Sequence, residues 1–425
     1  MCVMYSPRRV SRKSFAAVGA ALFIGLSFAP AGQSVADNYL NPHFEETIGT
    51  AREIYDGALT PDLAVSTYRN IDRLFPTNAI AIGAKPYPLP LADKQLAQVK
   101  VKFKSKGKDY DLFDYLALNR VSGVLVLKDG KVAYELYQYG NTPKTRWMSM
   151  SIAKSVTSTL IGAAVQDGLI ASIKDPVTKY VPRLKGSAYD GVTVRDIMMM
   201  SSGVKWSETY TDPSSDRRKM LEAQINQKPG ATMELMRTLP RAAPVGTVNV
   251  YDTGETQVAA EVVRAAIKKP LATYLSEKIW SKYGMEAPAN WWLDSPNGVE
   301  IGGSGISATL RDYGRFGLFI MNNGVVGDQH VLPETWLADA GSPKTLVGGK
   351  PLNYGYYWWI PAEGPSHEAG AFEARGAGGQ GIYVNQKEKV VIVVWGAQSK
   401  LGGGIAPITN TDFYDAVVEA LKPVS

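Results

Sequence analysis

Two pairs of expected strands, one toward each end of the chain, constrain most strongly how this sequence can fold. The first pair lies within Val121 to Tyr139, where alternating apolar runs flank Asp129-Gly130, a dipeptide typical of tight hairpin turns. The second pair lies at Gly381 to Asn385 and Val390 to Trp395. Between them, residues 151 to about 320 show mostly helical patterns and loops. We therefore expect an α+β fold: an antiparallel sheet built from both chain ends and flanked by helices, with an inserted, mainly helical subdomain.

A serine and a lysine stand together at the start of an expected helix, Ile152 to Gln166. Ser151 precedes this helix, and Lys154 follows three positions later. The spacing places a hydroxyl and an amine on one face, one turn apart. A serine hydroxyl is a poor nucleophile until a base takes its proton, and a partly desolvated lysine can do so. The alternative is an ordinary capping serine beside an exposed lysine.

Two other Ser-x-x-Lys matches lack this setting. Ser105, followed by Lys108, lies among alternating lysines that are typical of an edge strand with one solvated face. Ser202, followed by Lys205, precedes a glycine that favours a turn. Only Ser151 opens a long helix-compatible run, so it is the candidate nucleophile.

Scarce histidine and cysteine narrow the possible chemistry. The three histidines, His43, His330 and His367, lie in no setting typical of a Ser-His-Asp site or a zinc helix, and each is expected in a loop or at the surface. The single cysteine, Cys2, falls in a segment expected to be removed, which excludes disulfides and cysteine metal ligands from the mature chain. We expect a lysine or tyrosine base, no metal and no organic cofactor.

The first 36 residues predict a signal peptide. Four basic residues between positions 8 and 13 precede an apolar run, Phe15 to Pro30, and the small-residue segment Ser34-Val35-Ala36 suits cleavage. The apolar run is too short and alanine-rich for a confident membrane span, and either the general secretion or the twin-arginine route fits. We expect a periplasmic or secreted protein with no stable membrane span after leader removal. Removal of the signal peptide would lower the net charge from +6 to +2, so no nucleic-acid partner is expected.

Several motifs, taken in their order along the chain, resemble those of class C β-lactamase-like serine hydrolases. They are Thr145 to Ser155, Val192 to Met198 with Ser201-Ser202-Gly203, Tyr251-Asp252-Thr253, and Gly376 to Gln380. This superfamily includes DD-peptidases, β-lactamases, carboxylesterases and 6-aminohexanoate-dimer hydrolases. Residues 68–77 also resemble an extension of the aminohexanoate-dimer hydrolase branch, and that hydrolase and carboxylesterase branch is the best match.

The resemblance implies a serine β-lactamase/penicillin-binding-protein-like fold and a division of the chain. Residues 1–36 would be the signal peptide, residues 37–114 an N-terminal extension, and residues 115–425 the serine hydrolase domain.

The resemblance also implies a catalytic tyrosine facing the serine–lysine pair. Tyr251 matches by position and context, although Thr253 stands where asparagine is usual, which weakens a claim for β-lactam binding. A tyrosine beside a lysine ammonium can lose its proton more easily and serve as base and then acid. The implied catalytic residues are therefore Ser151, Lys154 and Tyr251.

Gly376 to Gln380 occupies the place of the family's Lys-Thr-Gly motif but has no lysine. The missing lysine argues against recognition of a substrate carboxylate by this motif. Gly376 and Gly378 permit close backbone approach and are predicted to contact the substrate. By the resemblance, the Ala377 and Ser151 amides form the oxyanion hole. A glycine-rich hairpin entry is the alternative.

Two aromatic segments complete the prediction. The segment Trp206 to Tyr210 resembles a family loop whose tyrosine can face an amide substrate, so Tyr210 is a predicted substrate contact. The segment Tyr354 to Trp359 is expected to be a strand that packs its rings on the core.

We interpret the chain as an exported serine hydrolase that cleaves a small-molecule amide or ester through an acyl-enzyme on Ser151, similar to 6-aminohexanoate-dimer hydrolases. One alternative is a β-lactamase or DD-peptidase, and the missing third-motif lysine argues against it. Another is a non-catalytic binding protein on the same fold, which the joint retention of Ser151, Lys154 and Tyr251 disfavours. The acyl donor and the oligomeric state are not readable from the sequence.

Overall fold

The computed structural model describes residues 41–401 and 406–422. The expected signal peptide, residues 1–36, lies outside the described residues. Within these two ranges, no helix combines the length and the apolar character needed to cross a membrane.

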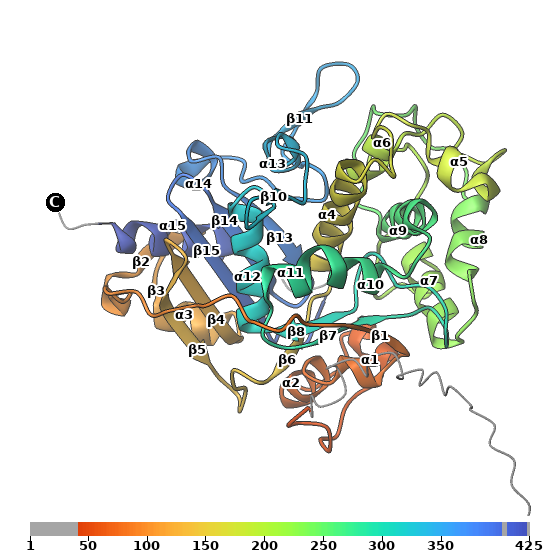
Figure 1. The fold of residues 1–425 in the computed structure, drawn as a ribbon. Helices are drawn as coiled ribbons and strands as arrows, with labels where there is room; N and C mark the ends of the chain where they lie inside the picture. Colours follow the sequence, from red (N-terminus) through yellow and green to blue (C-terminus); the bar gives the residue numbers. More distant parts are fainter. Residues whose placement is uncertain (1–40, 402–405, 423–425) are drawn as a thin grey trace, which may run out of the picture. The chain divides into compact units, whose positions relative to one another are not determined.

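A five-stranded antiparallel sheet joins the two ends of the chain (Figure 1). Its order is β13-β14-β15-β4-β5, and the pairing of β15 with β4 places Ile392 opposite Val126. The strands are β4 (Val121–Lys128), β5 (Lys131–Tyr137), β13 (Phe372–Gly376), β14 (Gln380–Asn385) and β15 (Val390–Gly396). Asp129 and Gly130 turn between β4 and β5 with φ of 51° and 75°, the left-handed pair that a two-residue hairpin turn requires. The expected α+β fold is confirmed.

Helices cover both faces of this sheet because its strands alternate apolar residues between two cores. Leu125 and Leu127 join the core beneath α12 (Leu310–Met321), which packs on β4, β14 and β15. Val124 and Val126 point to the opposite face, into a core shared with α3 (Leu112–Leu118) and α15 (Asn410–Leu421). The period of two along β4 thus sets both layers.

A second antiparallel sheet, of order β1-β7-β8-β6, was not expected from the sequence. Its strands are β1 (Thr77–Ile80), β6 (Arg146–Met148), β7 (Ala289–Trp292) and β8 (Ile306–Thr309). These strands are short and come from distant parts of the chain, so no local hairpin pattern predicts them. The sheet matters for the site because β6 leads directly to Ser151, and β8 follows Gly303 closely.

The inserted region is mainly helical, as expected. Its central pair is α4 (Ile152–Gln166), the helix predicted with the same bounds, and α9 (Thr253–Ile267), which packs against it. The surrounding helices are α5 (Val177–Tyr180), α6 (Val194–Met198), α7 (Asp216–Ile225), α8 (Ala231–Thr238), α10 (Leu271–Leu275) and α11 (Ser281–Tyr283).

The remaining elements are short. They are α1 (Ala51–Asp56), α2 (Pro61–Tyr68), α13 (Trp336–Ala340), α14 (Gly364–Glu368), and the strand pairs β2 (Lys102–Ser105) with β3 (Lys108–Asp111), β9 (Val325–Val326) with β10 (Gln329–His330), and β11 (Lys344–Thr345) with β12 (Pro351–Leu352). The lysines of β2 are exposed, as expected for an edge strand.

The expected strand at Tyr354 to Trp359 is wrong. Tyr354 and Trp359 form an isolated bridge that closes a tight loop, within which the Gly355 amide donates to the Trp358 carbonyl at 2.8 Å. The aromatic rings are nevertheless buried in the core, as expected. The aromatic residues correctly predicted burial here, but the chain reverses between Gly355 and Trp358, with Tyr357 at a φ of 61°, so no strand forms.

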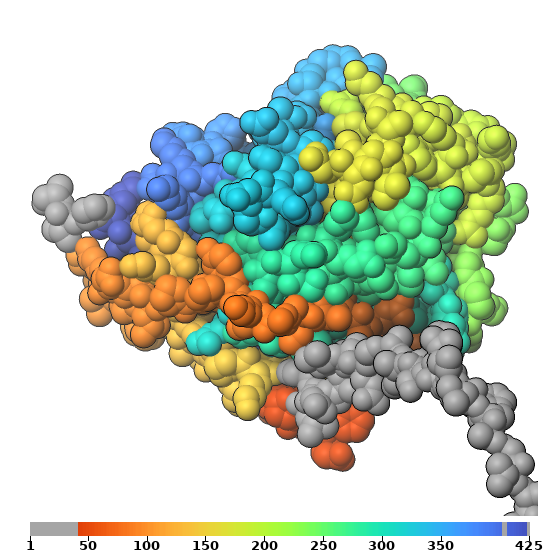
Figure 2. Space-filling view, in the orientation of Figure 1, coloured from red at the N-terminus to blue at the C-terminus, as the bar shows by residue number. Residues whose placement is uncertain are grey.

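The segment that follows β1 crosses the surface of the chain's later helices, as the orange trace in Figure 2 shows. The Tyr87 amide donates to the Gly284 carbonyl at 2.6 Å, and Arg315 Nε donates to the Tyr87 carbonyl at 2.9 Å. The residues before the hydrolase-like region are therefore packed onto it.

Close packing of α12 on the central sheet yields a stability prediction. A Cβ atom at Gly317 would lie 2.5 Å from Val391 Cγ1 and 3.2 Å from Ile382 Cγ2. We expect Gly317→Val to lower the free energy of unfolding by about 1–3 kcal/mol, measured by urea denaturation, because overpacking forces the helix off the sheet. Glu419→Val, at an exposed position of α15, should change it by about 0.5 kcal/mol or less. Equal effects of the two substitutions would contradict this packing.

Candidate active site

Ser151 and Lys154 are held together at the start of α4. Lys154 Nζ donates to Ser151 Oγ at 2.9 Å and to the Gly303 carbonyl at 3.0 Å. The lysine side chain is buried, with the residue 2% exposed. The one-turn spacing therefore brings the hydroxyl and the amine together, as the sequence predicted. The alternative of an exposed lysine beside a capping serine does not hold, because Lys154 is buried and Ser151 makes no side-chain capping bond.

Two backbone features shape this corner. Met150, between β6 and α4, has a φ of 41°, a strained conformation for a residue with a side chain. Gly303 brings its carbonyl to the lysine, and a Cβ atom there would lie 3.2 Å from Lys154 Nζ and 2.9 Å from Thr253 Cγ2. The run Gly302-Gly303-Ser304-Gly305 was a usable signal for this close approach, and the sequence analysis missed it.

Burial gives Lys154 the character of a base. Desolvation lowers the pKa of its amine to about 7, outweighing the carboxylates of Glu208 and Asp252, which raise that pKa. The nearby Arg217 guanidinium lowers it further. Near neutral pH a substantial fraction of Lys154 is thus uncharged and able to accept the Ser151 proton.

Tyr251 faces the same pair. It immediately precedes Asp252, the N-cap residue of α9. Its ring centroid lies 5.0 Å from Lys154 Nζ. Burial raises the pKa of Tyr251 well above its ordinary value, and a hydrogen bond with the Ser151 side chain opposes this only in part. The expectation that Tyr251 loses its proton more easily is therefore wrong in direction, because desolvation outweighs the hydrogen bond with Ser151 and the charge of Arg217, which lower its pKa. A phenol that keeps its proton suits a proton donor better than an initial base.

Glu208 anchors the far side of the site and was missed by the sequence analysis. It accepts hydrogen bonds from the Thr253 amide at 3.1 Å, from Thr253 Oγ1 at 2.5 Å and from Trp206 Nε1 at 2.5 Å. The threonine that replaces the family's usual asparagine therefore holds a carboxylate. An acid within the Trp206 to Tyr210 loop was the available signal.

A small cavity, of about 10 Å³, lies in front of Ser151. Its walls are Tyr55, Met150, Ser151, Tyr210, Arg217, Thr253, Gly303, Ser304, Ala377 and Leu401. The structure thus gathers the predicted residues Ser151, Tyr210 and Ala377 around one space. Within the described part of the chain, neither the Ser151 amide nor the Ala377 amide donates a hydrogen bond to a backbone carbonyl. An oxyanion hole requires amides that are left unused in this way.

Gly376 and Gly378 adjoin this cavity without lining it. A Cβ atom at Gly376 would lie 2.4 Å from the Ser149 carbonyl, so this glycine lets β13 approach the residues before the nucleophile. Gly378 has a φ of 84° and lies beside Met148 and Leu401. Both close approaches are to the protein itself, and the predicted contact with substrate stays a prediction.

Residues 117–404 match the family model described as Beta-lactamase. The chain belongs to the β-lactamase family. As such it is a serine hydrolase of the β-lactamase-like superfamily, and the resemblance drawn from the sequence is confirmed.

Individual relatives agree with this membership. A 6-aminohexanoate-dimer hydrolase of Paenarthrobacter ureafaciens is 28% identical over 300 residues, which cover 67% of this chain and 74% of the relative. A candidate 6-aminohexanoate-dimer hydrolase from Bacillus anthracis superposes with a TM-score of 0.73 at 24% identity, covering 88% of this chain and 99% of the other. A family VIII carboxylesterase gives 0.57 at 16%, covering 79% and 99%. At these identities the two structures support the fold alone.

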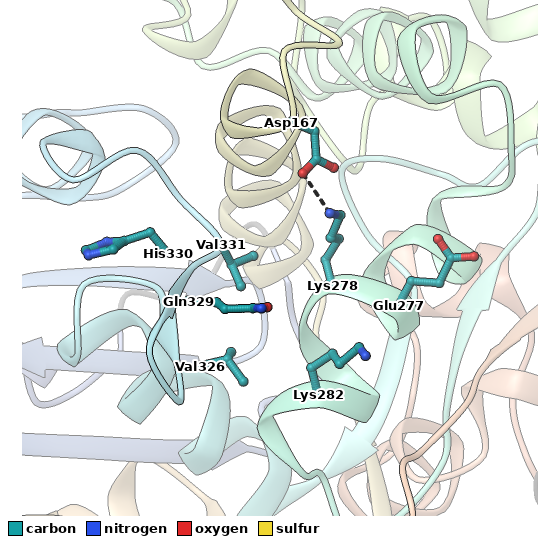
Figure 3. A pocket seen from close by; sticks show the side chains of 8 residues that line it. All are labelled: Asp167, Glu277, Lys278, Lys282, Val326, Gln329, His330 and Val331. Carbon is teal, nitrogen blue, oxygen red and sulfur yellow. Dashed lines mark hydrogen bonds and ion pairs between the residues drawn. The ribbon is translucent and has the colours of Figure 1, made fainter.

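A larger pocket, of about 390 Å³, contains none of the predicted site residues (Figure 3). Lys278 pairs with Asp167 at 2.7 Å across it, and His330 lies on its rim. His43 bonds Glu46 and Thr145 instead. Among the residues described, no three histidine, cysteine or carboxylate side chains are grouped to hold a metal ion.

The lowered pKa of Lys154 predicts a pH dependence. We expect the rate at which a fluorophosphonate labels Ser151 to rise with pH around a midpoint of about 7, since only the unprotonated amine can take the serine proton. Glu208→Gln removes a carboxylate that raises this pKa, so the midpoint should fall. Glu234→Gln, which breaks an exposed ion pair with Arg237 within α8, should leave it unchanged. A midpoint near 10.5, the ordinary lysine value, would contradict a desolvated base.

Proposed function

We propose that this β-lactamase-family protein hydrolyses an amide or ester bond through an acyl-enzyme on Ser151, with substrates of the kind that the name 6-aminohexanoate-dimer hydrolase describes. One observation carries the proposal. A buried lysine amine, with its pKa at about 7, lies 2.9 Å from the serine hydroxyl. An exposed, fully protonated lysine would offer no base at neutral pH.

The acylation step follows from these positions. Unprotonated Lys154 accepts the Ser151 proton as Oγ attacks the substrate carbonyl, and the resulting oxyanion is stabilised by the Ser151 and Ala377 amides. Tyr251 donates its proton to the leaving nitrogen or oxygen and regains one from the Lys154 ammonium. The bond to the leaving group breaks, an acyl-Ser151 ester remains, and water attacks it with the same groups acting in reverse.

The third motif favours an amidase or esterase over a β-lactamase or DD-peptidase. It has no lysine, and the nearest cation, Arg375, forms an ion pair with Glu373 and lies 5.2 Å from the centroid of the Trp359 ring. The Arg375 guanidinium is thus already engaged by contacts within the protein. We also propose that the protein is exported, on the basis of the basic start, apolar run and small-residue site in its first 36 residues.

Removing the nucleophile tests the proposal directly. Ser151→Ala should reduce kcat/KM for a p-nitrophenyl ester by about 10³-fold or more. Mass spectrometry should detect an acyl adduct on the wild type and none on the variant. The matched control is Ser105→Ala, which removes the serine of another Ser-x-x-Lys match, on β2. Undiminished turnover by folded Ser151→Ala would refute the proposal, and efficient hydrolysis of nitrocefin would favour the β-lactamase alternative.

The proton-donor role of Tyr251 predicts a dependence on the leaving group. Tyr251→Phe should lower kcat/KM by about 10²-fold or more for an anilide, and by less for a p-nitrophenyl ester, because a good leaving group departs without protonation. Tyr189→Phe is the control, since it deletes a buried hydroxyl that has no hydrogen-bond partner within the described residues. Equal losses for anilide and ester would argue that Tyr251 only positions Ser151.

A further inference from the structure

A buried arginine lines the cavity in front of Ser151. Arg217 lies on α7, is 3% exposed, and shares the cavity wall with Ser151 and Ala377. Arginine at such depth is rare unless its charge is paired, because removing a guanidinium from water is costly. Its partners therefore decide what this side chain does.

Those partners leave the guanidinium only partly satisfied. Nη2 donates to the Tyr55 hydroxyl, and Nε lies 3.9 Å from Glu208 Oε1, at the limit of an ion pair. Nη1 is buried without a hydrogen-bond partner among the residues that the structure describes. An unsatisfied donor on a charged group costs free energy that an acceptor would recover.

Glu208 does not complete the pairing. Its two carboxylate oxygens already accept three hydrogen bonds from Thr253 and Trp206, one of them at 2.5 Å from Thr253 Oγ1. Glu208 and Arg217 attract each other across 3.9 Å, but no hydrogen bond between them is found among the described residues. Arg217 is thus the one cationic side chain among the residues that line this cavity, and its Nη1 has no hydrogen-bond partner among the described residues.

Aromatic rings fix the guanidinium in place. Its carbon lies 4.4 Å from the Tyr55 ring centroid and 5.9 Å from that of Tyr210, and these two rings meet edge to face at 5.5 Å. Tyr55 comes from α1, in the expected N-terminal extension. Ion pairs Arg52–Glu222 and Arg218–Asp56 bind α1 to α7, so the extension builds one wall of the cavity.

We propose that Arg217 binds a carboxylate of the substrate, so that the enzyme acts preferentially on amides or esters that carry a carboxylate close to the scissile bond. The inference rests on the proposed function. A guanidinium matches a carboxylate through parallel N–H donors, and Nη1 supplies one that is unused. Because Ser151 and Arg217 line the same small cavity, only a short chain can separate the scissile carbonyl from the charge. Arg217 would thus supply, from a different element, the cation that the third motif lacks.

Matched neutral and anionic esters test this preference. p-Nitrophenyl butyrate is compared with mono-p-nitrophenyl glutarate, which adds a carboxylate to the acyl part, and phenyl acetate with p-acetoxybenzoate, which adds one to the leaving group. We expect wild type to favour the anionic member of at least one pair. In Arg217→Gln the ratio of kcat/KM, anionic over neutral, should fall by about tenfold or more. Arg217→Lys should retain part of it.

The ratio is taken within one preparation, so loss of folded enzyme or of general activity cancels. Arg237→Gln removes the same charge from an exposed position of α8, where the arginine pairs with Glu234 outside the cavity wall, and should leave the ratio unchanged. A wild type that favours neither anionic ester, or a ratio that survives Arg217→Gln, overturns the inference while leaving the acyl-enzyme intact. Absence of turnover and of any Ser151 adduct overturns the proposed function as well.

A measurement on the wild type alone guards against a variant that fails to fold. Butyrate should slow fluorophosphonate labelling of Ser151 more than butyramide at equal concentration, since only butyrate carries the charge. Equal protection by the two would contradict a carboxylate site at Arg217.

Discussion

The site depends on the burial of one amine. Lys154 is enclosed between the Ser151 hydroxyl and the Gly303 carbonyl, both within hydrogen-bonding distance of Nζ. Taking an ammonium out of water disfavours its charged form, and that desolvation is the largest influence on the Lys154 pKa. In the proposed mechanism, this desolvated amine acts as the base at neutral pH, and Ser151 acts as the nucleophile.

The two sheets, with glycines at two close approaches, position the residues that surround the buried Lys154. The central sheet supplies Ala377 at the end of β13, and the second sheet delivers Ser151 through β6. Glycine at 376 and 303 permits backbone approaches that any side chain would block. The core packing of α4 against α9 brings Tyr251 to the same point. Stability and chemistry are therefore linked, since loosening either contact would let water reach the lysine.

Charge in the cavity is arranged differently from what the motif comparison implied. The missing third-motif lysine argued against carboxylate recognition, and Arg375, its nearest replacement, is held by Glu373. Arg217 lies instead on the opposite, helical side, braced by Tyr55 and Tyr210. Membership of the β-lactamase family fixes the fold and the reaction class, while the proposed preference for a carboxylate rests on Arg217, which lies outside the motifs that resemble that family.

The sequence by itself determined the local elements and the reactive pair. Helix α4, the β4–β5 hairpin and the β14 and β15 strands follow from periodicity and turn chemistry, and Ser151 with Lys154 follows from the geometry of one helical turn. Tertiary structure decided what depends on residues far apart: the second sheet, the loop at Gly355, and the contact of Tyr55 with Arg217, which are separated by 162 positions. It also decided that the pKa of Tyr251 rises, because burial is a property of the packed chain and no motif records it.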